Sequence, residues 1–122
     1  MRAPDCEIAQ DDGVVVARLA GEIDLVNVPA IAAALRAGVP QDAIGVAVDL
    51  SGVRYLDSAG VQMLFQLAID LATTRKGMVV SLAPDSPLRT LLKITNLQEV
   101  AGVHDSLAEG GAALRGGEFL HY

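Results

Sequence analysis

Ser58 is the residue in this sequence whose type and position point most directly to chemistry. It lies in the tetrad Asp57-Ser58-Ala59-Gly60, between an expected strand and an expected helix. In α/β proteins, functional atoms gather at the carboxyl ends of parallel strands, next to helix N-termini. A serine hydroxyl in such a place can act as a nucleophile, accept a phosphoryl group or cap the helix.

A hydrolytic role for Ser58 requires a base, and the sequence offers only His104 and His121. His104 could lie at the same sheet edge, which leaves a triad open. Ser58 is not in a Gly-x-Ser-x-Gly elbow, and neither a Walker motif nor a Gly-x-Gly-x-x-Gly follows a strand. The histidines and Cys6 are scattered, without metal-ligand spacing. We therefore expect no catalytic residue, no metal and no cofactor.

A phosphoryl group on Ser58 would meet the free N–H groups and the favourable dipole of a helix start. It would add roughly −1.5 to −2 charge beside Asp57 and, if the loop ends converge, Asp24. The alternative is that Asp57 or Ser58 simply caps the helix, a contribution of about 1 kcal/mol. Spacing alone favours the simple cap, because capping serines are common, and it leaves both roles open.

Composition predicts a single soluble domain. The chain has 122 residues, of which 52% are apolar and 3% aromatic, so its core must be aliphatic. A net charge of −6 without a cluster of Lys or Arg argues against a nucleic-acid surface. No secretory signal is visible, and the apolar stretches are too short to span a membrane. We expect a cytoplasmic protein without direct membrane insertion.

The pattern of strands and helices predicts an α/β fold with the order ββαβαβαβα. An initial hairpin turns at Asp11-Asp12-Gly13, and later strands and helices alternate, so the sheet is mixed and mostly parallel. Gly21 is expected to lead the chain out of the sheet, and Ser51-Gly52 to end the central strand. The expected strands are 6–9, 14–19, 46–50, 78–82 and 100–103; the four helices begin near Asn27, Ser58, Ser86 and Ser106. A domain over 1–115 and a C-terminal tail over 116–122 follow.

The helix after Ser58 carries a predicted core stripe with a spacing of three and four residues. Its members are Val61, Leu64, Phe65, Ala68, Leu71 and Ala72. Met63 falls nearly opposite this stripe, and Leu67 falls between the two faces. An exposed methionine can anchor a partner, because its side chain adapts to irregular surfaces.

Four stretches of the sequence resemble motifs of a known family. Val48-Asp49-Leu50-Ser51-Gly52-Val53, followed by Leu56-Asp57-Ser58-Ala59-Gly60-Val61, closely resembles the signature of STAS-domain anti-sigma factor antagonists. Gly21-Glu22-Ile23-Asp24 resembles the family's second motif, and Leu92-Lys93-Ile94-Thr95-Asn96-Leu97 resembles its third-helix exit more loosely. The resemblance covers roughly residues 6–115, and the element order agrees.

The resemblance implies a partner-switching role and no enzymatic activity. In such proteins the serine matching Ser58 is phosphorylated by an anti-sigma factor that is also a kinase with a GHKL-type ATP site. The unphosphorylated antagonist binds that kinase and frees the sigma factor, and a PP2C-type phosphatase resets the modified form. Carried over to this chain, Asp57 and Gly60 shape the loop and Asp24 is a neighbouring contact. Helix geometry adds Val61 and Met63 as apolar docking area.

Other functions remain open at this stage. The chain could be a STAS scaffold subunit of a sensory complex, or an accessory STAS subunit of a membrane lipid-transport ATPase. A small enzyme that uses Ser58 and His104 is a further alternative.

Overall fold

The computed structural model describes residues 6–117, and its element order confirms the predicted α/β fold. Strands and helices alternate after an initial hairpin, and one short 3-10 helix, η1, is added. The elements are β1 (Cys6–Asp11), β2 (Val14–Ile23), α1 (Val28–Ala37), β3 (Gly45–Leu56), α2 (Ser58–Ala72), β4 (Gly77–Ser81), α3 (Leu88–Ile94), η1 (Leu97–Glu99), β5 (Gly102–His104) and α4 (Leu107–Arg115).

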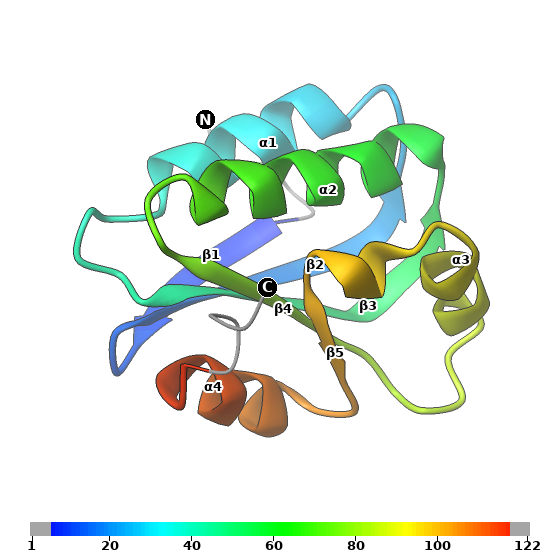
Figure 1. Ribbon diagram of the computed structural model, residues 1–122. Helices are drawn as coiled ribbons and strands as arrows, with labels where there is room; N and C mark the ends of the chain where they lie inside the picture. The colour runs from blue at the N-terminus through cyan, green and yellow to red at the C-terminus, as the bar shows by residue number, and fades with distance from the viewer. Residues whose placement is uncertain (1–5, 118–122) are drawn as a thin grey trace.

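The five strands form one sheet in the order β1-β2-β3-β4-β5. β1 and β2 are antiparallel, and the other neighbours are parallel, as predicted for a hairpin followed by crossover helices. Asp12 and Gly13 make the hairpin turn, both with positive φ. α1 and α2 lie together over one face of the sheet, α4 covers the other face, and α3 lies at one end (Figure 1).

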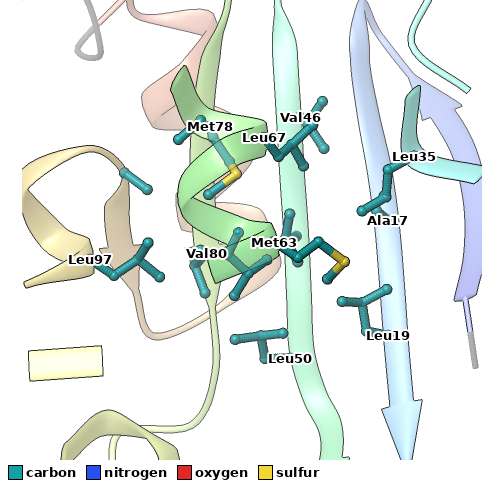
Figure 2. Close-up of a cluster of buried hydrophobic side chains, with 14 of the residues drawn as sticks. Ala17, Leu19, Leu35, Val46, Leu50, Met63, Leu67, Met78, Val80 and Leu97 are labelled. Carbon is teal, nitrogen blue, oxygen red and sulfur yellow. The ribbon is translucent and has the colours of Figure 1, made fainter. Parts of the chain in front are cut away.

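Both faces of β4 and of the first part of β3 (residues 45–48) are buried, and the residues there are almost uniformly apolar. The larger core lies between the sheet and the pair α1 and α2 (Figure 2). It is aliphatic, as the composition predicts, and Ile31, Leu50 and Leu64 are each 1% exposed or less. A smaller cluster under α4 consists of Val14, Val16, Ala47, Val79 and Leu114.

The predicted ends of the two longest strands are wrong. β2 continues through Gly21 to Ile23, and β3 continues through Ser51-Gly52 to Leu56. The two extensions pair with each other. The register of this pairing shifts between Arg18 and Ala20 and again between Gly21 and Glu22, as at a β-bulge. Gly21 has a φ of +79°, which glycine adopts without strain. As a result only Asp57 separates β3 from α2.

The remaining differences lie at element ends. β4 stops at Ser81, and the last strand is Gly102–His104 because η1 and a turn occupy the residues before it. α4 contains Gly110-Gly111 and is capped, as predicted, by Ser106, whose Oγ accepts a hydrogen bond from the Glu109 N–H (3.2 Å). Of the predicted tail, 118–122 lies outside the described residues.

Candidate functional site at the start of helix α2

Ser58 is the first residue of α2 and is exposed, while Asp57 occupies the N-cap position. The Gly60 N–H donates to Asp57 Oδ1 (3.0 Å), so the aspartate performs the capping role that the sequence left open between the two residues. The Ser58 side chain makes no hydrogen bond to any residue in the described part of the chain. Its hydroxyl is therefore available to a partner.

Asp57 also joins α2 to the loop that follows β2. Its second oxygen, Oδ2, accepts a hydrogen bond from the Leu25 N–H (3.2 Å), and its own N–H donates to the Ile23 carbonyl oxygen (3.1 Å). The carboxylate thus links two segments that are more than thirty residues apart in the sequence. The loop that contains Asp24 lies beside the start of α2 because β2 and β3 pair up to Ile23 and Leu56.

Asp24 organises the loop rather than pointing freely at a partner. Its Oδ1 accepts hydrogen bonds from the Val26 N–H (3.0 Å) and the Asn27 N–H (3.3 Å). Asn27 Oδ1 accepts one in return from the Asp24 N–H (2.9 Å), and Asn27 Nδ2 donates to the Glu22 carbonyl oxygen (2.7 Å). Asn27 stands at the N-cap position of α1 as predicted, but its side chain makes no cap hydrogen bond there.

This turn exposes two apolar side chains that the sequence analysis missed. Leu25 is 74% exposed and Val26 is 88% exposed. The sequence signal that could have predicted this exposure is an apolar pair enclosed by Asp24 and Asn27. Aspartate and asparagine are both common in turns. Such a pair belongs neither to the preceding strand nor to the stripe of the following helix.

The predicted exposure of Met63 is wrong. Met63 is 7% exposed and Val61 is 6% exposed, so neither offers much area to a partner. Because α2 packs on the sheet and also beside α1, its buried surface is wider than one stripe. Met63 and Leu67 lie on the inner side of α2, among side chains of the sheet (Figure 2). Ala72, which was expected to be buried, is exposed.

A groove of about 310 Å³ lies between α1 and α2 and is open to solvent. Its lining is mainly apolar, and Leu25 and Ala59, which neighbour the site residues, contribute to it. The other lining residues are Val28, Ala32, Leu35, Arg36, Gln62, Met63, Gln66, Leu67 and Asp70. The groove therefore extends the Ser58 surface along the two helices.

The structure does not bring Ser58 and His104 together as a serine hydrolase would require. The His104 ring lies close to Gly102 and to Gly110 of α4, and α4 covers the sheet face opposite α2 (Figure 1). Ser58 and His104 are thus on different sides of the sheet, and His121 lies outside the described residues. No group of His, Cys, Asp or Glu within residues 6–117 could hold a metal ion. Burial raises the pKa of the Cys6 thiol, which disfavours its reactive thiolate.

None of the helices formed by residues 6–117 combines the length and the apolarity that a membrane span requires.

Gly60 is the residue whose replacement tests the packing beneath this site. A Cβ on Gly60 would lie 2.5 Å from Leu56 Cδ1 and 3.1 Å from Ile23 Cγ2. We expect Gly60→Ala to lower the free energy of unfolding by about 1–3 kcal/mol, since overpacking outweighs the higher helix propensity of alanine. Urea denaturation measures the change. Exposed Ala72→Gly in the same helix is the control, and a Gly60→Ala variant as stable as the wild type would contradict the expected clash.

A mixed five-stranded sheet with paired helices on one face, one helix on the other and an exposed serine at the start of α2 defines the class: a small α/β domain. The family model described as "Mlab, STAS domain" matches residues 6–107. The chain belongs to the STAS-domain family.

Relatives of this chain are anti-sigma factor antagonists. It is 29% identical over 120 residues to the anti-sigma-F factor antagonist RsfB of Mycobacterium tuberculosis, covering 96% of this chain and 97% of RsfB. It is 28% identical to an anti-sigma factor antagonist from Mycobacterium paratuberculosis of known structure, with a TM-score of 0.80 and coverage of 94% and 99% of the two chains.

The fold is also that of SpoIIAA, an anti-sigma factor antagonist. The unphosphorylated form of SpoIIAA is 20% identical with a TM-score of 0.75, covering 91% of this chain and 96% of SpoIIAA. The phosphorylated form of Bacillus SpoIIAA is 20% identical with a TM-score of 0.59, covering 80% and 89%.

Proposed function

We propose that this chain is a cytoplasmic anti-sigma factor antagonist that works by partner switching, controlled by phosphorylation of Ser58. The unphosphorylated form binds an anti-sigma factor with GHKL-type serine kinase activity and so releases the sigma factor. The observation that carries the proposal is the exposed Ser58 hydroxyl, which Asp57 leaves unbonded by capping α2 itself. The names of the relatives support the role, and SpoIIAA is a neighbour in fold that has a phosphorylated form.

In this proposal the chain is a substrate and not a catalyst. Ser58 Oγ attacks the γ-phosphorus of ATP held by the kinase; the new O–P bond forms as the bond to the β–γ bridging oxygen breaks and ADP leaves. The hydroxyl proton passes to a base of the kinase. A PP2C-type phosphatase restores the serine by hydrolysis, in which water supplies the oxygen of the departing inorganic phosphate.

The local structure supports a phosphate at this position without refolding. Amides in the first turn of a helix lack intrahelical acceptors and favour negative charge. The phosphate nevertheless adds about −1.5 to −2 charge next to Asp57, which holds the loop that contains Asp24, on a chain with a net charge of −6. The surface that a partner meets changes in charge, while the core beneath α2 stays as it is.

Intact-mass spectrometry tests the proposal. Each anti-sigma kinase encoded in the source genome is purified and incubated with the full chain and ATP. We expect one kinase to add a single phosphoryl group to the wild type and to Ser51→Ala, but none to Ser58→Ala. Ser51 is a suitable control because it is also exposed, although its hydroxyl donates to Asp49 Oδ1 (2.7 Å).

Absence of any added phosphate with the whole panel would overturn the proposal. Stable co-purification with an integral membrane complex instead of a soluble kinase would favour the accessory transporter role.

A further inference from the structure

Leu25 and Val26 form an apolar tip directly beside Ser58. They protrude from the loop between β2 and α1, where solvent reaches most of each side chain. The hydrogen bond from the Leu25 N–H to Asp57 Oδ2 places the tip next to the first turn of α2. Exposed apolar side chains grouped at a functional site mark a surface for a protein partner.

The apolar tip continues into the groove between α1 and α2. Leu25 lines the groove together with Val28 at the start of α1 and Met63 in α2, and Ala59 lines its end next to Ser58. A partner that covers Ser58 can therefore bury the tip and enter the groove in the same contact.

The charge of this surface indicates what the partner must look like. The loop with the end of β2, α1, and α2 with its N-cap together supply four acidic residues and one basic residue, Arg36, which lines the groove from the last turn of α1. The acidic residues are Glu22, Asp24, Asp57 and Asp70. Electrostatic complementarity then favours a partner surface whose apolar cleft is bordered by basic side chains.

Asp24 shapes the turn that carries the apolar tip, and Asp57 fixes the Leu25 end of the tip to α2, because its two oxygens are used by two different segments. Oδ1 accepts from Gly60 of α2 and Oδ2 accepts from Leu25 of the loop. The carboxylate cannot turn away from either N–H without breaking that hydrogen bond.

We propose that the apolar tip is a docking element for the anti-sigma factor, which meets it with an apolar cleft bordered by basic residues, and that Asp57 holds the tip in its docking position. This inference rests on the proposed function. A phosphate on Ser58 then acts twice: it places a dianion in the contact, and it competes with the Asp57 carboxylate for the amides of the helix start. Displacement of Asp57 frees the Leu25 N–H and with it the tip.

The positioning role of Asp57 is tested on the free protein, without any partner. Asn at position 57 offers one acceptor oxygen and cannot serve both N–H groups, so we expect Asp57→Asn to raise the exchange rate of the Leu25 amide with water at least fivefold, as measured by NMR. Asp70→Asn is the matched control, since within residues 6–117 the Asp70 carboxylate accepts from Gln66 Nε2 (2.9 Å) in the same helix and from no residue of the loop. The Glu109 amide at the start of α4 reports whether the fold is intact. An unchanged Leu25 exchange rate would overturn the role of Asp57.

The docking role is tested by calorimetry in the absence of ATP, with each purified anti-sigma factor of the source genome as the probe. The double variant Leu25→Ser/Val26→Ser should bind at least tenfold more weakly than the wild type. Ile94→Ser is the control, because Ile94 is 72% exposed but lies on α3. Equal affinity of the double variant and the wild type would overturn the docking role.

Two other outcomes separate this inference from the proposed function. A kinase that binds through the tip but never modifies Ser58 would refute the phosphorylation switch and would still support the docking role of the tip. A concentration-dependent dimer of the free chain that the double variant loses, seen by sedimentation, would assign the tip to a second copy and overturn the docking role. Failure of every anti-sigma factor to bind the wild type would overturn both proposals.

Discussion

Phosphorylation of Ser58 is expected to weaken binding of the anti-sigma kinase more than a hundredfold, while the thermal midpoint of unfolding moves by no more than a few degrees. A dianion in the middle of an interface must be desolvated or repelled, and a loss of about 3 kcal/mol already exceeds a hundredfold in affinity. The fold is spared because Ser58 is exposed and contributes neither the helix cap nor a core contact.

Calorimetric titration of the purified phosphorylated chain into the kinase measures this change. Ser58→Ala should bind like the wild type, because the serine hydroxyl makes no hydrogen bond within residues 6–117 that the fold would miss. Ser58→Glu should lie between the two, since a carboxylate carries less charge than a phosphate. Equal affinity of the phosphorylated and unmodified chains would contradict the electrostatic switch.

Truncation of Leu64 should cause the largest loss of stability among the residues of α2. Leu64 is fully buried (0% exposed) in the core between α2 and the sheet, and neighbouring backbone can collapse only partly into the space left behind. We expect Leu64→Ala to lower the free energy of unfolding by about 2–5 kcal/mol.

Urea denaturation followed by circular dichroism measures the loss at equilibrium. Ile69→Ala is the matched control: Ile69 lies in the same helix but is 50% exposed, so its truncation should change stability by about 0.5 kcal/mol or less. Similar losses in the two variants would mean that α2 does not pack on the sheet in the described orientation.

The sequence predicted the fold because strand and helix patterns agree with each other along the chain. It failed at the ends of β2 and β3, where Gly21, Ser51 and Gly52 are residues that usually end a strand. Here each strand supplies the other's hydrogen-bond partners beyond those residues. The pairing of two segments distant in sequence decided the outcome, and local propensity could not show it.

The geometry of the candidate site could be predicted from the sequence only in part. The tetrad at Asp57 marked the start of α2, but which of its two polar residues caps the helix depends on side-chain geometry that spacing does not determine. Met63 was predicted to be exposed because a helical wheel considers α2 alone. In the structure α1 also packs beside α2 and widens its buried face. Leu25 and Val26 were missed because their exposure follows from the turn that Asp24 closes.

The single residue between β3 and α2 has a consequence for recognition. Ser58 belongs to the first turn of a helix that is anchored on the sheet, so the chain around it cannot be drawn out into an extended strand without unfolding α2. An enzyme that modifies Ser58 must therefore read a folded shape rather than a linear motif. Under the proposed function, Ser58 is modified only in a folded domain, so unfolded chains take no part in the switch.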